Sequence, residues 1–415
     1  MIGIDISRGG MIVASTRSVT TDTRLRVTGP GRIEHTAVDH TQTGWTASID
    51  ISTPNSGALR WFDERDPCDI RIYDTDTGEP LGTVVSANAP SQASTPNRWT
   101  ITARGLEAPL QGRTMPTRRF VKKGQWNLAF QFDTIEMMFH LAALERRRYL
   151  EAQPTSSWGM SSNTRFRADV TPPADPSKTT DTATANGEQV GRANSVGGYH
   201  YLWHWRIDGG ATLWAEIQRL AGHLAVIPTF DRYGNFDVWW PVPRRVPAEF
   251  VTEVFTDDTA AGYPTVDRQG TRVSGAFIYA DVDGTEFSAF AGPNRVTSIA
   301  PDHIDLRDPL HVPSARPTTI DISRVSALPS TGYTTHHVCD VTRLAAQAWG
   351  HSVDTPGRIL MDLDRFDPTM TPGKIGYASL PGRARGLHRV TSVRHTWETG
   401  GHTARTSVTA QELAP

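Results

Sequence analysis

The stretch TLWAEIQRLAGHLAVIPTFDRYGNFDVWWP, residues 212–241, shows a helical hydrophobic period that gives way to two short strands. In its first half, apolar residues recur on one helix face: Leu213, Ile217, Leu220, Ala221 and Leu224. Gly222 suits the C′ position, at which helices commonly end. The second half predicts a hairpin, in which LAVIPTF and NFDVWW are joined by the turn DRYG. Pro228 marks the first of these strands as an edge strand.

The sequence before this unit predicts strands, with hardly any helix signal from residue 1 to about 112. Three segments show the alternation of strands: 32–52, 68–87 and 98–110. In the first, Trp45, Ala47 and Ile49 alternate with polar residues, as in a half-buried strand. In the second, a turn is expected at Asp76-Thr77-Gly78.

A helix, a polar stretch and a strand are predicted next. The helix covers 134–150, where Asp133 and Glu136 can form a capping box. Residues 152–198 have the composition of a linker or long loop. YHYLWHWRI, residues 199–207, has period 2 and therefore predicts a strand.

The C-terminal part returns to strands and turns. Residues 250–330 include a hairpin around Asp283-Gly284. A second helix is predicted over 338–350, and strand, turn and strand over 357–381. A last hairpin is joined at Gly400-Gly401.

Composition limits the class of protein. Of the 415 residues, 38% are hydrophobic and 21% are charged, and 35 Gly and 28 Pro favour many turns and short strands. A net charge of −2 gives no whole-chain argument for nucleic acid or an anionic membrane. No secretory signal and no stretch approaching 18 apolar residues is present, so we expect no transmembrane helix and synthesis in a cytosol-like compartment.

The candidate metal sites have simpler interpretations. Cys68 and Cys339 neither require nor exclude a disulfide, and no Cys/His spacing matches a zinc site. His200 and His204 are four apart, a metal spacing on a helix, but they fall on a predicted strand. The run HHVCD, residues 336–340, ends in Asp340, which fits the N-cap of the following helix.

The remaining chemical signals are also weak. DTDTG, residues 74–78, begins like a calcium loop but lies between two strands, which favours a hairpin turn. Asp257-Asp258 and Asp362/Asp364 fit solvated charge. Four tryptophans suit core or interface anchors better than a sugar platform: Trp203, Trp205, Trp239 and Trp240. Because the sequence also lacks the common nucleophile and phosphate-binding motifs, we predict no catalytic, cofactor-binding or metal residues and no enzyme.

Two groups of residues carry a family resemblance. The first is Asp69-Ile70-Arg71-Ile72 with Gly82-Thr83; the second is Pro368, Pro372-Gly373, Gly386, His388, Val390, Val393, His395 and Thr403. With the order of units, they resemble the baseplate hub family of tailed bacteriophages, which includes the late control protein D group and the N-terminal part of siphophage tail-associated proteins. The chain departs from that family in the length of 152–198 and in Lys374, where an acidic residue is common.

The resemblance implies a mainly β fold with a few helices (α+β). It implies two tube-protein-like β-barrels, 1–125 and 250–415, and a middle helix-hairpin domain, 126–249, that holds the long loop. Family hubs are trimers whose two barrels per subunit imitate six tube units, so that a threefold tip can sit on a sixfold tube.

The implied function is that of a structural virion protein of the tail tip, a homotrimer assembled in the host cytoplasm that lines the DNA channel during genome ejection. The implied partners are a distal tail ring protein and the tail tube above, and tip or fibre proteins below. No cofactor, membrane segment or sequence-specific DNA contact is implied. Three alternatives stay open: a tail-borne cell-wall hydrolase, a carbohydrate-binding tail protein, and the sixfold distal tail ring protein.

Overall fold

The computed structural model describes the chain in segments. These are residues 1–8, 11–20, 24–53, 68–86, 91–92, 97–114, 118–125, 138, 141–142, 182–185, 188–192, 200–207, 209–224, 227–239, 251–267, 276–282, 285–292, 295–298 and 357–413.

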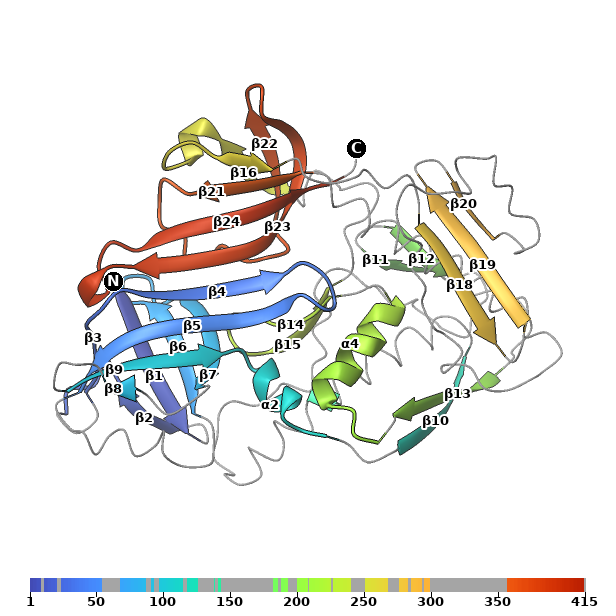
Figure 1. Ribbon diagram of the computed structural model, residues 1–415, viewed down its shortest axis with the longest axis horizontal. Helices are drawn as coiled ribbons and strands as arrows, with labels where there is room; N and C mark the ends of the chain where they lie inside the picture. Colours follow the sequence, from blue (N-terminus) through green and yellow to red (C-terminus); the bar gives the residue numbers. More distant parts are fainter. Residues whose placement is uncertain are drawn as a thin grey trace.

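Fifteen strands from both ends of the chain form one sheet (Figure 1). The N-terminal strands are β1 (Ile2–Arg8), β2 (Met11–Ser15), β3 (Arg26–Val27), β4 (Gly31–Ala37), β5 (Thr43–Ser52), β6 (Asp69–Asp74), β7 (Pro80–Ser86), β8 (Ser91–Gln92) and β9 (Arg98–Arg104). The C-terminal strands are β16 (Val251–Thr256), β17 (Thr265–Asp267), β21 (Arg358–Asp362), β22 (Ile375–Leu380), β23 (Ala384–Trp397) and β24 (Arg405–Glu412). Short 3-10 turns cover Asp257–Thr259 and Thr399–Gly401. The mainly β fold class is therefore confirmed.

The two sets of strands meet where β4 pairs with β23. The order along the sheet is β17-β21-β24-β23-β4-β5-β9-β7-β6-β1-β2. The β4–β23 pairing is antiparallel and runs from Thr36 opposite Ser392 to Gly31 opposite Trp397. Gly31 makes this approach possible, because a Cβ there would lie 2.4 Å from the Trp397 ring. A glycine is thus required where the two ends of the chain join.

Local alternation correctly predicts most of these strands. In β5, Trp45, Ala47 and Ile49 are buried while the residues between them are exposed or half-buried. β6 and β7 pair around the turn that holds Asp76-Thr77-Gly78, which confirms the hairpin. The final hairpin of β23 and β24 is confirmed as well, with positive φ at Gly400 and Gly401.

The buried side chains form two large clusters. The first gathers residues of the N-terminal strands, among them Ile4, Ile33, Ile49, Ile70, Val84 and Ile101. The second gathers residues of the C-terminal strands, among them Phe255, Ile359, Met361, Val390, Val393 and Val408. Trp397 lies at the end of β23 but belongs to the first cluster, so the C-terminal segment also contributes to the N-terminal core.

The helix and hairpin of residues 212–241 are confirmed. They are α4 (Leu213–Leu224), β14 (Ile227–Phe230) and β15 (Phe236–Trp239). The predicted helix end at Gly222 is wrong, because the helix continues to Leu224. A glycine inside a helix costs only about 1 kcal/mol relative to alanine, which packing of the apolar stripe can offset.

The strand predicted over 98–110 is also too long. It ends at Arg104, and Glu107–Gln111 form the short helix α2. Gly105 follows the strand, and Pro109 falls within the first helical turn, where its missing N–H costs no helical hydrogen bond.

Three smaller sheets complete the described chain. They are β10 (Arg118–Gln125) with β13 (His200–Ile207), β11 (Thr182–Ala185) with β12 (Glu188–Arg192), and β18 (Ala276–Val282) with β19 (Thr285–Gly292) and β20 (Arg295–Ser298). The β13 strand and the β18–β19 hairpin confirm two predictions. The β11–β12 hairpin corrects another, because it lies inside the stretch 152–198 that the composition assigned to a linker or loop. The dipeptide Asn186-Gly187 between these strands is a strong sequence signal for a hairpin, but the polar composition of the whole stretch favoured a loop.

Two predicted helices fall largely or wholly outside the described residues. Of 134–150, three residues are described; Met138, Leu141 and Ala142 are helical and buried in the first cluster. The helix over 338–350 lies outside entirely. None of the helices in the described segments is long and apolar enough to cross a membrane.

Candidate functional site

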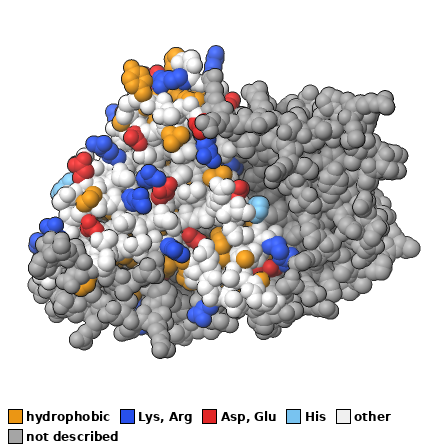
Figure 2. Space-filling view, viewed as in Figure 1, with side chains coloured by type: hydrophobic (Ala, Val, Ile, Leu, Met, Phe, Trp, Pro, Cys, Tyr) orange, Lys and Arg blue, Asp and Glu red, His pale blue; other side chains and the backbone are white. Residues whose placement is uncertain are grey.

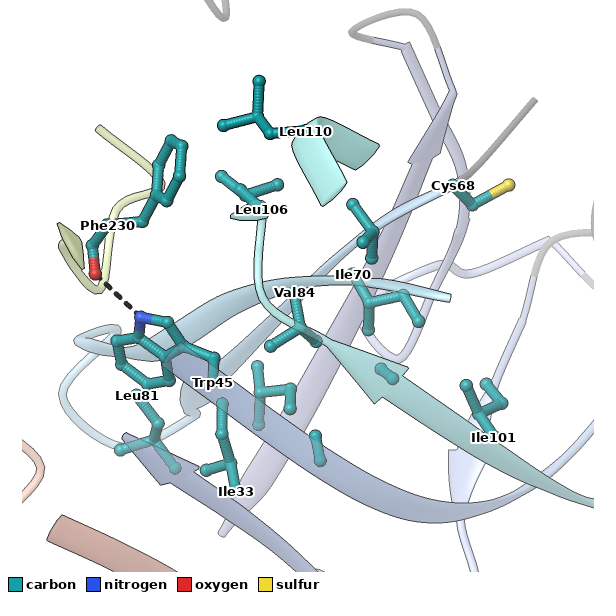
Figure 3. Packing of buried hydrophobic residues seen from close by; sticks show 14 of the residues in the cluster. Ile33, Trp45, Cys68, Ile70, Leu81, Val84, Ile101, Leu106, Leu110 and Phe230 are labelled. Atoms are coloured by element: carbon teal, nitrogen blue, oxygen red, sulfur yellow. Dashed lines mark hydrogen bonds between the residues drawn. The ribbon is translucent and has the colours of Figure 1, made fainter. Parts of the chain in front are cut away.

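The hairpin of β14 and β15 covers a stacked pair of rings on the main sheet. His35 in β4 and Trp45 in β5 are direct cross-strand partners, and their rings stack with centroids 3.9 Å apart. The Trp45 indole N–H donates to the Phe230 carbonyl oxygen at 2.7 Å (Figure 3). His35 Nε2 lies 2.8 Å from Thr229 Oγ1. All four residues are buried, so these polar contacts fix the position of the hairpin in a dry environment.

A buried carboxyl group binds the backbone of the same tryptophan. The Trp45 backbone N–H donates to Glu107 Oε1 at 3.0 Å. Gly44 and Gly105 make room for the carboxyl group. A Cβ at Gly44 would lie 2.5 Å from Glu107 Oε1, and a Cβ at Gly105 would lie 2.0 Å from Glu107 Oε2. Burial raises the pKa of Glu107 to about 7, although hydrogen bonds from backbone N–H groups oppose the shift.

Helix α4 is attached to the first core by its apolar stripe. The stripe residues Leu213, Ile217, Leu220 and Ala221 are buried, as predicted. Trp214 joins them and stacks on Phe230 of the hairpin, with ring centroids 6.2 Å apart. Helix and hairpin therefore pack as one unit onto the N-terminal strands.

The hairpin turn has a rigid internal geometry. The Asp231 carboxylate accepts hydrogen bonds from the backbone N–H groups of Tyr233 and Asn235, at 2.9 and 2.8 Å. Gly234 has φ of +86°, a conformation that side chains with a Cβ rarely adopt. A Cβ there would also lie 3.0 Å from Leu106 Cδ1. The position predicted as the end of the turn thus requires glycine for two reasons.

Arg232 at this turn joins three parts of the chain. Its Nη2 lies 2.9 Å from Glu79 Oε2, at the hairpin of β6 and β7. Its Nη1 donates to the Pro368 carbonyl oxygen at 3.1 Å, in the segment between β21 and β22. Its own carbonyl oxygen accepts a hydrogen bond from Thr83 Oγ1 at 3.1 Å. With 17% of its side chain exposed, the guanidinium is shielded enough for these contacts to be stronger than a surface ion pair.

A buried histidine lies beside this junction. His395 Nδ1 is 3.1 Å from Thr406 Oγ1, and the ring meets the edge of Phe366 at 5.7 Å between centroids. Phe366 in turn packs against the first core. Burial lowers the pKa of His395 to about 4; Asp367 opposes the shift and the Arg232 charge adds to it.

The acidic residues singled out in the sequence lie in separate places. Asp257 is paired with Arg383, and Asp362 accepts a hydrogen bond from Ser407. Lys374, which departs from the family pattern, forms an ion pair with Glu253 at 2.7 Å. No group of three His, Cys, Asp or Glu side chains in the described segments could hold a metal ion.

Several predicted candidates cannot be placed fully. His200, His204, Trp203 and Trp205 lie on β13, as their period-2 spacing predicts. Trp239 ends β15, whereas Trp240 and the HHVCD run lie outside the described residues. Cys68 is buried, and Cys339 lies outside, so the state of the pair stays untested.

Comparison with known proteins supports an assignment of fold. No family model and no curated protein matches the sequence. Among solved structures, a tail protein from Neisseria meningitidis MC58 has a TM-score of 0.55 at 12% identity, covering 99% of this chain and 96% of that one. The chain has the fold of this tail protein. The expected resemblance to proteins of the tail is thereby confirmed at the level of the fold.

Two further structures are similar at lower scores. The 43 kDa tail protein of prophage MuSo2 from Shewanella oneidensis has a TM-score of 0.49 at 11% identity, covering 99% of this chain and 98% of that one. A type VI secretion system component of Escherichia coli has a TM-score of 0.40 at 8% identity, covering 94% and 77%.

Proposed function

We propose that this chain is a structural protein of a phage-type tail tip, a hub whose three copies form a closed ring. The observation that carries the proposal is the pair of cores under one continuous sheet, joined through β4 and β23. Three copies with two such units each offer six units to a sixfold tube, and a ring of identical contacts satisfies closed symmetry. The tail-protein fold supports the same assignment.

In this proposal the helix-and-hairpin unit holds the two cores in one orientation. Arg232 and Phe366 each contact elements that are distant in sequence, and the Trp45–His35 stack of β4 and β5 is hydrogen-bonded to the hairpin. Rigid attachment matters because each subunit would have to present both units at a fixed angle for a ring to close. The unit boundaries 1–125, 126–249 and 250–415 belong to this proposal.

The proposed partners are the distal tail ring protein and tube on one side and tip or fibre proteins on the other. DNA would pass through the channel of the ring without sequence-specific contacts, and the location would be the virion. Native mass spectrometry of the purified protein and electron microscopy of the particle test the symmetry. Three copies are expected; a sixfold ring would favour the distal ring protein, and a monomer in the particle would refute the hub.

We also propose that the chain has no catalytic activity of its own. The motivating observation is that the buried polar groups described above bind backbone or each other, in positions that fix structure. Zymography of the purified protein on host cell wall is expected to give no clearing. Lysis that disappears when one Asp or His is replaced would assign a hydrolase instead.

A further inference from the structure

The exposed apolar side chains are not spread evenly over the described segments. Eight of the nine large ones lie at two ends of the fifteen-stranded sheet, and Tyr233 is the exception. Those at the β1–β2 end are Met1, Met11, Ile12 and Val19, and those on the outer C-terminal strands and their connections are Val254, Tyr263, Leu360 and Tyr377. Figure 1 shows these two ends on opposite sides of the sheet, and Figure 2 shows apolar side chains at the upper end, near β16 and β22. Single exposed apolar residues are common, but their restriction to two ends indicates contact surfaces.

The first surface is basic, and we call it the β2 end. β2 is the last strand on its side of the sheet order, and its residue Ser15 forms a bridge with Arg24. Arg17 lies over the ring of Tyr73, 4.0 Å from the centroid. Both arginines are exposed, and the described residues 11–20 and 24–27 contain three Arg and no Asp or Glu. Asp22 lies outside the described residues. The β2 end consists of Met11, Ile12, Val19, Arg17 and Arg24.

The second surface is acidic, and we call it the β16 end. Residues 251–267 contain four Asp or Glu and no Lys or Arg. Glu253 is paired with Lys374 and Asp257 with Arg383, whereas Asp258 is exposed on the short 3-10 turn. The β16 end consists of Val254, Tyr263, Asp257 and Asp258.

The exposed Tyr263 is held in position by its neighbours. The Arg383 guanidinium lies 5.7 Å from the centroid of the Tyr263 ring and donates a hydrogen bond to the Pro264 carbonyl oxygen at 3.3 Å. A side chain that is already ordered loses less conformational entropy when a partner binds it. Tyrosine is also among the residue types that contribute most to binding at interfaces. Tyr263 therefore has the properties of an interface anchor.

Side chains, rather than free backbone groups, are what β16 offers to a partner at this point. Thr259 Oγ1 accepts a hydrogen bond from the Thr256 backbone N–H at 2.9 Å and lies 3.2 Å from the Val254 carbonyl oxygen. These two backbone groups of β16 are therefore occupied within the chain. The Val254 side chain remains exposed on the same strand.

We propose that the β2 end of one copy of this chain packs against the β16 end of the next copy. A contact between two β2 ends would bring Arg17 and Arg24 against their own copies, and a contact between two β16 ends would do the same for Asp258. Such like-charge contacts oppose association, whereas the two different ends combine apolar side chains with opposite charges. A contact between different ends is heterologous, and repetition of it can close a ring. The inference rests on the proposed function for the number of copies, which is three.

The test compares assembly of the full-length wild type with two variants that each block one end. Ile12→Asp brings an acid to face the acidic end, and Tyr263→Arg brings a cation to face the basic end. The two side chains are 61% and 94% exposed, so the folded subunit should be retained. Sedimentation velocity and native mass spectrometry measure the number of copies. Each variant alone should be monomeric, and the concentration for half assembly should rise at least about tenfold.

Mixing the two variants identifies which ends meet. The Ile12→Asp copy keeps its β16 end and the Tyr263→Arg copy keeps its β2 end, so one intact contact is possible only between the two variants. The mixture should therefore form species that contain both. Contacts between like ends predict the opposite result, because each variant alone would then form dimers through its unchanged end.

A matched control puts the same charge into the middle of the sheet. Thr46 is exposed on β5, and Thr46→Asp should leave the concentration for half assembly within about twofold. Urea unfolding checks that each variant is folded. If Ile12→Asp is not, Val19→Asp serves, because Val19 belongs to the same end but lies outside β2.

Three results would overturn the inference. They are a wild type that stays monomeric at the highest soluble concentration, a folded end variant that assembles as the wild type does, and an end variant that forms dimers alone. A trimer that both variants keep refutes only this inference and leaves the two ends to another tail protein. A ring of another copy number that both variants lose refutes only the hub. If the wild type is monomeric in solution, the symmetry of the particle decides on the hub separately.

Discussion

Replacing Glu107 by Gln should stabilise the protein at alkaline pH relative to acid pH. The folded state holds the proton of this carboxyl group more tightly than the unfolded state does, because burial raises the pKa from 4.5 to about 7. The contribution of Glu107 to the free energy of unfolding is therefore complete below about pH 4.5, falls as the pH rises, and is constant above about pH 7. Gln keeps the shape of the side chain and an oxygen that can accept the Trp45 N–H.

The size of the effect follows from the shift in pKa. One pKa unit corresponds to about 1.4 kcal/mol, so ionising Glu107 in the fold costs about 3 kcal/mol at alkaline pH. The Gln amide also brings an N–H₂ group towards backbone donors, which costs free energy at every pH alike. The decisive quantity is therefore the change with pH in the stability difference between variant and wild type.

Urea unfolding at about pH 4.5 and about pH 8.5, with linear extrapolation to water, measures this quantity. The difference in unfolding free energy should move by about 3 kcal/mol in favour of the variant at the higher pH. Glu398→Gln removes the same charge from a side chain that is 65% exposed and should shift by less than about 0.5 kcal/mol. A Glu107→Gln difference that is equal at both pH values would show that the carboxyl group is not held protonated by burial.

Three other replacements test the helix-and-hairpin unit and the junction. Ile217→Ala should cost roughly 2 to 5 kcal/mol in urea unfolding through the cavity it leaves, and a cost below about 1 kcal/mol would contradict the buried stripe. Arg232→Ala should reduce trimer formation in native mass spectrometry more than thermal stability, whereas Arg232→Lys, which keeps the charge but not the planar fork, should recover only part of it. His395→Gln should remove the contribution of His395, a loss of about 3 kcal/mol as the pH falls from 6.5 to about 4, so the stability difference between variant and wild type should change by that amount in the same unfolding assay; a difference that does not change with pH would refute it.

The sequence predicts elements whose signal is local. The alternation of Trp45, Ala47 and Ile49 and the helical spacing of α4 each lie within one element, so a window of a few residues contains the evidence. A predicted boundary is wrong where packing competes with a local preference. At Gly222 the local preference is to end the helix, but packing of the apolar stripe continues it to Leu224.

The contacts of the junction leave no comparable trace in the sequence. The β4–β23 pairing joins residues more than 350 positions apart, and its register depends on the shape of two cores that no short window describes. Glu107 lies in a stretch that alternation assigned to a strand, and only burial in the folded state gives it an unusual pKa. Arg232 was visible as one residue of the turn DRYG, without any sign of its partners Glu79 and Pro368.

The two buried titrating groups have opposite effects on the folded state. Glu107 costs stability as the pH rises from 4.5 to about 7, and His395 costs stability as the pH falls from 6.5 to about 4. Both costs are about 3 kcal/mol, so their sum changes little over this range although each group alone produces a slope. Glu107→Gln should therefore reveal a stability that rises with pH, and His395→Gln one that falls, while the double variant returns to the profile of the wild type. Parallel profiles in the two single variants would contradict the opposite pKa shifts, and a double variant that differs from the sum of the two single changes would show that the groups are not independent.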